Sequence, residues 1–183
     1  MGRCGVKCQP TRGPRWRSPP AQPPRSAFFS RFHNTTPKTL AFRGHFEHTL
    51  DAKNRLTVPA TFRTALAGGI VIAQSLEPCA AIWTPEAFEA FTDSFLSDLN
   101  PLSDEARRMS RFFHGGSFDT EIDKAGRVMI PARLIEKVGL GKDLVIVGND
   151  DHLELWDSEA WASYETDLDA TVIQTVEKIV NPS

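Results

Sequence analysis

FEHTLDAKNRLTVPATFR, residues 46–63, and FDTEIDKAGRVMIPARLI, residues 118–135, align without a gap at a distance of 72 positions. The matched residues are chemically specific: Phe46 with Phe118, Leu50 with Ile122, Asp51 with Asp123, Arg55 with Arg127, and Pro59 with Pro131. A second match, of Ile82-Trp83 with Leu155-Trp156, follows further along the chain. Self-similarity at a fixed distance indicates that the chain contains two copies of one supersecondary unit.

The pattern of apolar and polar residues divides each copy into elements. Residues 46–50 and 118–122 alternate with the period of a half-buried strand, and residues 55–58 and 127–130 resume the alternation. We therefore expect each copy to open with a β-hairpin. Pro59 and Pro131 suit the first turn of a short helix, after which two further strands and another helix are expected. Each copy is thus predicted to be β-β-α-β-β-α.

The four residues between the two strands of each expected hairpin have the composition of a tight turn. They are Asp51-Ala52-Lys53-Asn54 in the first copy and Asp123-Lys124-Ala125-Gly126 in the second. Asn54 occupies the place of Gly126, and both residue types tolerate a positive φ. We expect a left-handed residue at this position, with Asp51 and Asp123 capping the backbone of the turns.

A single copy of about 45–50 residues would bury too little surface to be stable alone, so the two copies are expected to share one core. The predicted fold is α+β. It consists of two tandem units with pseudo-twofold symmetry around a β-barrel-like core, followed by a C-terminal helix. The predicted boundaries are residues 42–92 for the first unit, 93–115 for a connecting helix, 116–163 for the second unit and 164–183 for the C-terminal helix.

The first part of the chain differs sharply in composition from the rest. Residues 1–41 contain eight basic groups, no acidic group and seven of the 13 prolines, whereas residues 42–183 contain 13 basic and 23 acidic groups. Such a segment cannot bury enough apolar surface to order itself, so residues 1–40 are expected to form a disordered basic extension. Three interpretations of it stay open: an arm that holds nucleic acid, an organellar transit peptide, and a segment upstream of the true translation start.

Several classes of function are disfavoured by the sequence. The longest apolar-or-glycine stretch, residues 66–73, is far shorter than the roughly 18 residues of a membrane span. His45 and His48 flank Glu47, but residues three apart on a strand point to opposite faces, and Cys79 lies in an apolar strand typical of a buried, inert thiol. No phosphate-binding glycine loop or nucleophile motif is present. We expect no enzyme activity, metal, cofactor, small-molecule substrate or membrane partner.

Beyond core positions, both copies share an Asp-x-x-x-Arg motif with a lysine inside it: Asp51, Lys53 and Arg55, and Asp123, Lys124 and Arg127. One interpretation is a surface ion pair between the aspartate and the arginine, worth no more than about 1 kcal/mol. The other is that the arginine is displayed for contact with a guanine or a phosphate, since a two-stranded ribbon can enter the major groove of DNA. Turn chemistry requires the aspartate but not the arginine, which favours binding to nucleic acid.

DAKNRLTVPATFR and DKAGRVMIPARLI resemble the paired motifs of the MraZ family, bacterial proteins that contain two AbrB-like (SpoVT-AbrB) domains. The resemblance runs from residue 42 to about residue 180 and includes FRGHFEHTLD, RRMSRFFHGG and LVIVGNDDHLELWD. It implies a DNA-binding transcriptional regulator of the cytoplasm and nucleoid, acting at short repeats upstream of the division and cell-wall gene cluster. It further implies ring-shaped homo-oligomers, in which Arg55 and Lys53 are the principal contacts with double-stranded DNA. Arg127 and Lys124 are their counterparts in the second copy, and whether the second copy also contacts DNA stays open.

Two further points bear on this expectation. The AbrB-like hairpin also resembles that of antitoxins, so a module that binds another protein is the alternative function. The net charge of residues 42–183 is −10, but affinity for DNA follows local phosphate contacts rather than net charge. One hairpin would bind weakly, whereas several copies in a ring would gain effective concentration on spaced repeats.

Overall fold

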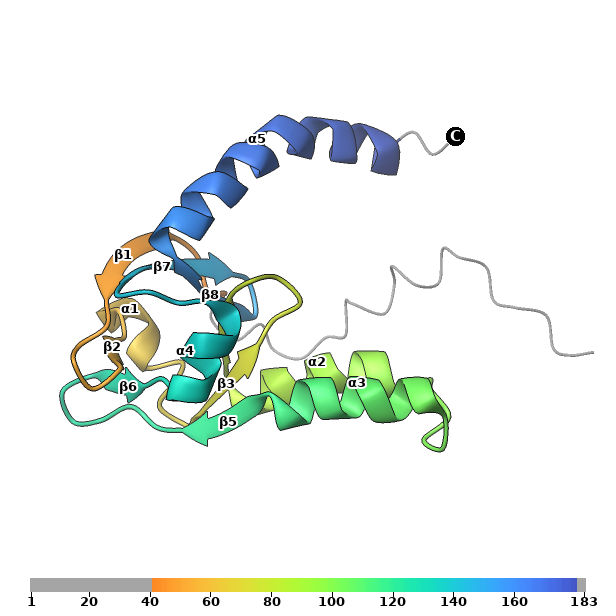
Figure 1. The fold of residues 1–183 in the computed structure, drawn as a ribbon, viewed down its shortest axis with the longest axis horizontal. Helices are drawn as coiled ribbons and strands as arrows, with labels where there is room; N and C mark the ends of the chain where they lie inside the picture. Colours follow the sequence, from red (N-terminus) through yellow and green to blue (C-terminus); the bar gives the residue numbers. More distant parts are fainter. Residues whose placement is uncertain (1–40, 181–183) are drawn as a thin grey trace, which may run out of the picture. The chain divides into compact units, whose positions relative to one another are not determined.

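The computed structural model describes residues 41–180 (Figure 1). The elements of the first half are β1 (His45–Thr49), β2 (Arg55–Thr57), α1 (Ala60–Arg63), β3 (Ile70–Gln74), β4 (Ala80–Trp83) and α2 (Pro85–Leu96). Next come α3 (Asp104–Gly115), β5 (Ser117–Thr120), β6 (Arg127–Met129), α4 (Ala132–Val138), β7 (Asp143–Asn149), β8 (His152–Asp157) and α5 (Ser158–Val180). The predicted extension over residues 1–40, and the last three residues of the predicted C-terminal helix, lie outside the described residues.

The strands form two antiparallel sheets. The larger has six strands in the order β1-β7-β8-β4-β3-β5, so that each half of the chain contributes three of them. The smaller consists of β2 and β6 alone. The fold is therefore α+β, as predicted, but the ladders leave β1 and β5 as open edges and do not close the expected barrel.

The two predicted hairpins are not formed. β1 pairs with β7, with Phe46 opposite Ile146, and β5 pairs in the same way with β3. Strands β2 and β6, one from each copy, pair with each other instead. Within the first copy, Leu50 and Leu56 form an isolated bridge, and the amide of Asp51 donates a hydrogen bond to the carbonyl of Arg55 at 3.0 Å. Both copies carry the same alternation of residues, so the sequence pattern could not reveal which copy supplies the partner strand.

Pairing between the copies produces one shared core. Leu56 and Val128 lie opposite each other in the β2–β6 ladder, with 0% and 1% of their surface exposed. They belong to a single apolar cluster that also holds Ile72 from the first half and Ile146 from the second. The expectation that the copies share a core is therefore confirmed by the packing.

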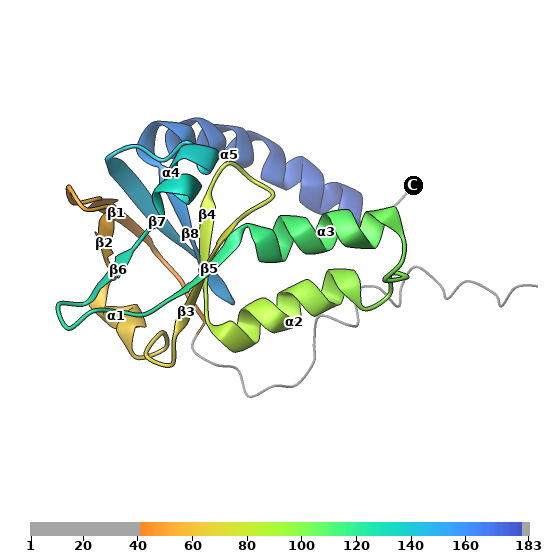
Figure 2. The same ribbon diagram turned by 60° about the horizontal axis from the view of Figure 1, so that its bottom comes forward.

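Helices α2 and α3 lie side by side (Figures 1 and 2), and each begins at a capping hydroxyl. The side chain of Thr84 accepts a hydrogen bond from the amide of Ala87, and that of Ser103 accepts one from the amide of Ala106. The aromatic rings of Phe91 and Phe113 meet at 5.4 Å between the two helices. The predicted connecting helix, residues 93–115, thus covers the end of α2 and all of α3.

The last helix predicted for the second copy and the predicted C-terminal helix form one helix, α5. α5 begins at Ser158, because the carboxylate of Asp157 caps its first turn. This carboxylate accepts hydrogen bonds from the amides of Glu159 and Ala160 at 3.0 and 3.3 Å. The predicted boundary between residues 163 and 164 falls inside this helix. Trp161 is 8% exposed and packs beside Trp156, which anchors the beginning of α5 on the sheet.

Candidate nucleic-acid interface

The first turn is organised by the carboxylate of Asp51. Its Oδ1 accepts hydrogen bonds from the backbone amides of Lys53 and Arg55 at 2.7 and 3.0 Å. Its Oδ2 accepts from the Arg55 guanidinium, 2.7 Å from Nε and 2.6 Å from Nη2. Asn54 has a φ of 57°, which confirms the predicted left-handed residue.

The second turn repeats this geometry. Asp123 Oδ1 accepts from the amides of Ala125 and Arg127 at 2.8 and 3.0 Å. Asp123 Oδ2 accepts from Nε and Nη2 of Arg127 at 2.9 and 2.7 Å. Gly126 takes the left-handed position with a φ of 78°. The sequence motif therefore encodes one turn structure, which the chain builds twice.

The structure brings the two turns together. The left-handed residue of each turn accepts a hydrogen bond from the other copy: the amide of Ile130 donates to the carbonyl of Asn54, and that of Val58 to the carbonyl of Gly126, both at 2.9 Å. In the β2–β6 ladder Thr57 lies opposite Arg127. All the residues predicted to bind DNA or shape the turns therefore gather at the β2–β6 end of residues 41–180, away from α2 and α3 (Figure 2).

The ion pairs shift the pKa values of both aspartates and of Arg127. The hydrogen bond from the Arg55 side chain, helped by two backbone amides, lowers the pKa of Asp51 to about 2. The Arg127 side chain lowers the pKa of Asp123 in the same way. Asp123 raises the pKa of Arg127, and Asp51 adds to this rise across the ladder. Both aspartates are therefore charged at neutral pH and fix the direction of the guanidinium groups.

The lowered pKa of Asp51 predicts a pH-dependent contribution to stability. Because the folded pKa lies below the ordinary value of 3.8, the charged form stabilises the fold above that pH, and this contribution is lost as the pH falls toward 2. Asp51→Asn is expected to lower the thermal unfolding temperature at pH 7, with the difference from the unmodified protein shrinking toward pH 2. Asp104→Asn, at an aspartate 70% exposed on α3, is the matched control. A difference that stays constant over this pH range would contradict the prediction.

The ion pairs leave the lysines as cations without a partner. Lys53 and Lys124 are exposed, and within residues 41–180 neither has a carboxylate within 4.0 Å. Arg55 and Arg127 keep 27% and 32% of their side chains exposed while paired to their aspartates. From the sequence, the surface ion pair and the exposed arginine are alternatives. In the structure, each arginine is both paired to its aspartate and partly exposed.

Sequence reasoning missed Arg63 of α1. Its Nε donates to the carbonyl of Val58 at 2.9 Å, and its guanidinium lies in the space that a Cβ on Gly126 would occupy. The aligned residue in the second copy is Ile135, and the aligned residue of Gly126 is Asn54. This pair of linked mismatches in an otherwise matching repeat was the signal that could have identified Arg63.

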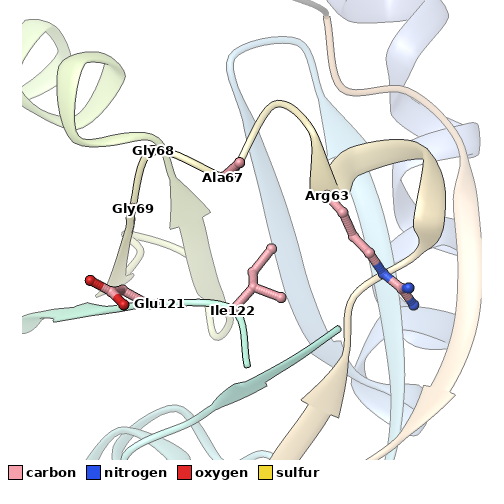
Figure 3. Close-up of a pocket in the computed structure, with 6 residues that line it drawn as sticks. All are labelled: Arg63, Ala67, Gly68, Gly69, Glu121 and Ile122. Atoms are coloured by element: carbon pink, nitrogen blue, oxygen red, sulfur yellow. The ribbon is translucent and has the colours of Figure 1, made fainter. Parts of the chain in front are cut away.

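Arg63 also borders a cavity of about 350 Å³ together with Ala67, Gly68, Gly69, Glu121 and Ile122. Figure 3 shows the Glu121 carboxylate pointing away from the Arg63 guanidinium, with Ile122 between them. The lining offers no convergent set of polar groups of the kind that orients a small ligand. Within residues 41–180, no three His, Cys, Asp or Glu side chains are grouped to hold a metal ion.

None of the helices between residues 41 and 180 combines the length and the hydropathy that a bilayer-spanning helix needs.

The fold and the paired turns define a protein built from a duplicated unit, and comparison with known proteins gives the family. A family model described as MraZ protein and as antitoxin-like matches residues 41–112 and again residues 113–180. The chain is 39% identical over 140 residues to the transcriptional regulator MraZ of Lactiplantibacillus plantarum, covering 76% of this chain and 99% of the relative. For the protein of the same name from Lachnoclostridium phytofermentans, identity is 38% over 126 residues, covering 69% and 88%. The chain belongs to the MraZ family.

Proposed function

We propose that the protein is a transcriptional regulator that binds double-stranded DNA through the two Asp-x-x-x-Arg turns at the β2–β6 ribbon. The observation that carries the proposal is the juxtaposition of these turns, which present Arg55 and Arg127 on one end of the fold. The relatives are named transcriptional regulators, a class without catalytic activity, which agrees with this function. The proposed targets are the repeats upstream of the division and cell-wall gene cluster, and the proposed location is the nucleoid.

The two turns are proposed to be related by a pseudo-twofold axis through the β2–β6 ribbon. The pairing supports this, because Leu56 and Val128 are equivalent positions and lie directly opposite each other. The order of the large sheet also supports it. Read from either edge, the sheet presents equivalent strands of the two copies: β1 and β5 at the edges, then β7 and β3, then β8 and β4 in the middle. A dyad of this kind suits DNA, whose backbone has local twofold symmetry at each base pair.

In the proposed complex, the aspartates orient the arginines before DNA arrives. Each aspartate engages Nε and Nη2 of its arginine, and the guanidinium carries five N–H donors in a fixed plane. The remaining donors on the exposed edge can contact a guanine or a phosphate. Because the side chain is already ordered, binding loses less conformational entropy than with a free arginine. Lys53 and Lys124 add phosphate contacts beside them.

A gel-shift series tests the proposal. The full chain is mixed with DNA from upstream of its own gene and with unrelated DNA of equal length, across a range of salt concentrations. We expect a retarded complex on the upstream DNA that weakens as salt rises, because phosphate contacts release counterions. Equal affinity for both DNAs at every salt concentration, or no complex, would contradict sequence-specific regulation.

Binding by so few cations requires several copies on one DNA, and the proposed oligomer is a ring. The surface of α5 supports association with a second copy. Of the ten large hydrophobic residues exposed in the described part of the chain, six lie on this helix: Leu168, Val172, Ile173, Val176, Ile179 and Val180. An apolar face of this extent is typical of a surface that another protein covers.

The α2–α3 pair of a neighbouring copy offers a complementary surface. Phe95 is 38% exposed there, and Arg108 lies one helical turn before the half-buried Phe112. Residues 158–173 of α5 contain four acidic groups and no basic one. Apolar contact between the two surfaces, with the acids of α5 facing Arg108, would join copies head to tail, and such contacts close into a ring when the rotation between copies permits.

Introducing charge on α5 tests this association. The double substitution Val172→Asp and Val176→Asp is expected to convert the oligomer into a smaller species, because it places two carboxylates in the apolar face. Ala170→Asp, exposed on the opposite side of the helix, is the matched control and should leave the size unchanged. Light scattering coupled to size-exclusion chromatography measures the mass. An unmodified protein that is monomeric, or a double variant of unchanged mass, contradicts the prediction.

The alternative function is an antitoxin-like module, a term that the family description also uses. In that case the apolar face of α5 would bind a different protein rather than a second copy. Mass measurement of the purified protein separates the two functions, since self-association needs no added partner.

A further inference from the structure

We propose that Arg63 is a third arginine of the proposed DNA-binding site, which holds the second turn in place and donates to a phosphate of the bound DNA. The inference rests on the proposed function and adds a residue outside the Asp-x-x-x-Arg motif. It concerns a side chain that comes from the first copy but lies against the turn of the second.

The first step concerns charge. Arg55 and Arg127 are each bound to a carboxylate within 3 Å, so neither brings an uncompensated charge to the turns. Within residues 41–180 no carboxylate lies within 4.0 Å of Arg63, and the nearest acid of its cavity, Glu121, points away (Figure 3). Arg63 therefore brings an uncompensated positive charge to Gly126 of the second turn.

The second step concerns geometry. The Nε of Arg63 donates to Val58, which leaves the two terminal nitrogens of the guanidinium for other acceptors. One of them, Nη1, lies over Gly126 together with Cζ and Nε, at a place where the absence of a side chain lets the guanidinium lie directly on the backbone of the turn. A half-buried guanidinium held in this way is suited to a phosphate, which it binds through paired N–H donors.

The third step concerns asymmetry between the halves. Ile135 occupies the position of Arg63 in the second copy, and Asn54 occupies the position of Gly126. In the first turn, the side chain of Asn54 begins at this place. In the second turn, the Arg63 guanidinium from the other copy lies there instead. The two turns share one backbone structure but differ by one cation, so the second turn is proposed to make the stronger contact with the DNA backbone.

The test measures how the affinity of the full chain for DNA depends on salt, with upstream and unrelated duplexes. The slope of log affinity against log salt is negative, and loss of one phosphate contact reduces its magnitude by about 0.9 for each site engaged. Arg63→Gln is expected to reduce the magnitude of the slope by at least this amount on both duplexes, because a phosphate contact carries no sequence information. Arg63→Lys keeps the charge and is expected to keep the slope. Arg107→Gln, at an exposed arginine of α3, is the control and should leave the slope unchanged.

Thermal unfolding of the same variants separates binding from folding. Both Arg63→Gln and Arg63→Lys remove the guanidinium whose Nε donates to Val58, so they should lower the unfolding temperature by similar amounts. If Arg63 has only a structural role, the two variants should also have the same salt dependence of DNA binding. Arg63→Gln with an unchanged salt slope would overturn the inference while leaving the proposed function intact. Failure of the unmodified protein to bind either duplex would instead overturn the proposed function itself.

Discussion

Arg55→Ala is expected to abolish specific binding to the upstream repeats while leaving the assembly of the protein unchanged. A well-placed arginine contact with a base discriminates by about 1–3 kcal/mol, and the loss recurs at every copy that engages the DNA. A fall of at least 100-fold in affinity for the upstream duplex is therefore expected. The remaining binding should come from Lys53, Lys124 and the second turn, and should be equally strong on unrelated DNA.

Arg107→Ala is the matched control, because Arg107 is also paired to an aspartate, Asp104, but on the surface of α3. It should bind both duplexes like the unmodified protein. Circular dichroism and light scattering on Arg55→Ala establish that the fold and the oligomer persist. An Arg55→Ala protein that still shifts the upstream duplex at the original concentration would refute a role for this turn in recognition.

Leu56→Ala is expected to destabilise the whole described domain rather than the first half alone. Leu56 is fully buried opposite Val128 in the β2–β6 ribbon, and truncation of a buried leucine costs about 2–5 kcal/mol. Met129 of the same ribbon is 58% exposed, so Met129→Ala should change the free energy of unfolding by no more than about 0.5 kcal/mol. Urea unfolding at one fixed protein concentration measures both, since association would otherwise shift the transitions.

The shape of the urea transition carries a second result. Because one apolar cluster contains residues from both halves, unfolding of Leu56→Ala should remain a single transition displaced to lower urea. Two separate transitions, with only the first displaced, would show that the halves are independent and would contradict the shared core.

Local features of this protein were predictable from its sequence. The aspartate caps, the positive φ of Asn54 and Gly126, and the pairing of Arg55 with Asp51 all depend on residues within five positions of one another. Turn chemistry of this kind is determined by neighbours in the chain. The candidate site residues were found because the two aligned copies share the Asp-x-x-x-Arg motif, and their role in binding DNA stays a prediction.

Long-range features were not predictable in the same way. A strand such as Arg55–Thr57 carries the same alternation whether it pairs within its copy or with Arg127–Met129 of the other, so the expected hairpins were wrong. Arg63 was missed because its significance depends on a contact with Gly126, 63 positions further along the chain. Only its disagreement with Ile135 in the aligned repeat pointed to a different environment.

The pairing of β2 from one copy with β6 from the other has a consequence for the architecture. In an isolated copy, the strand that corresponds to β2 or β6 would have no partner strand. Such a copy would have to associate with a second copy to satisfy the backbone amides and carbonyls of that strand. The covalent linkage makes that association intramolecular, so the β2–β6 pairing forms without loss of translational freedom and at any dilution. Because both copies lie in one chain, their sequences can also differ. The first copy carries Arg63 where the second carries Ile135.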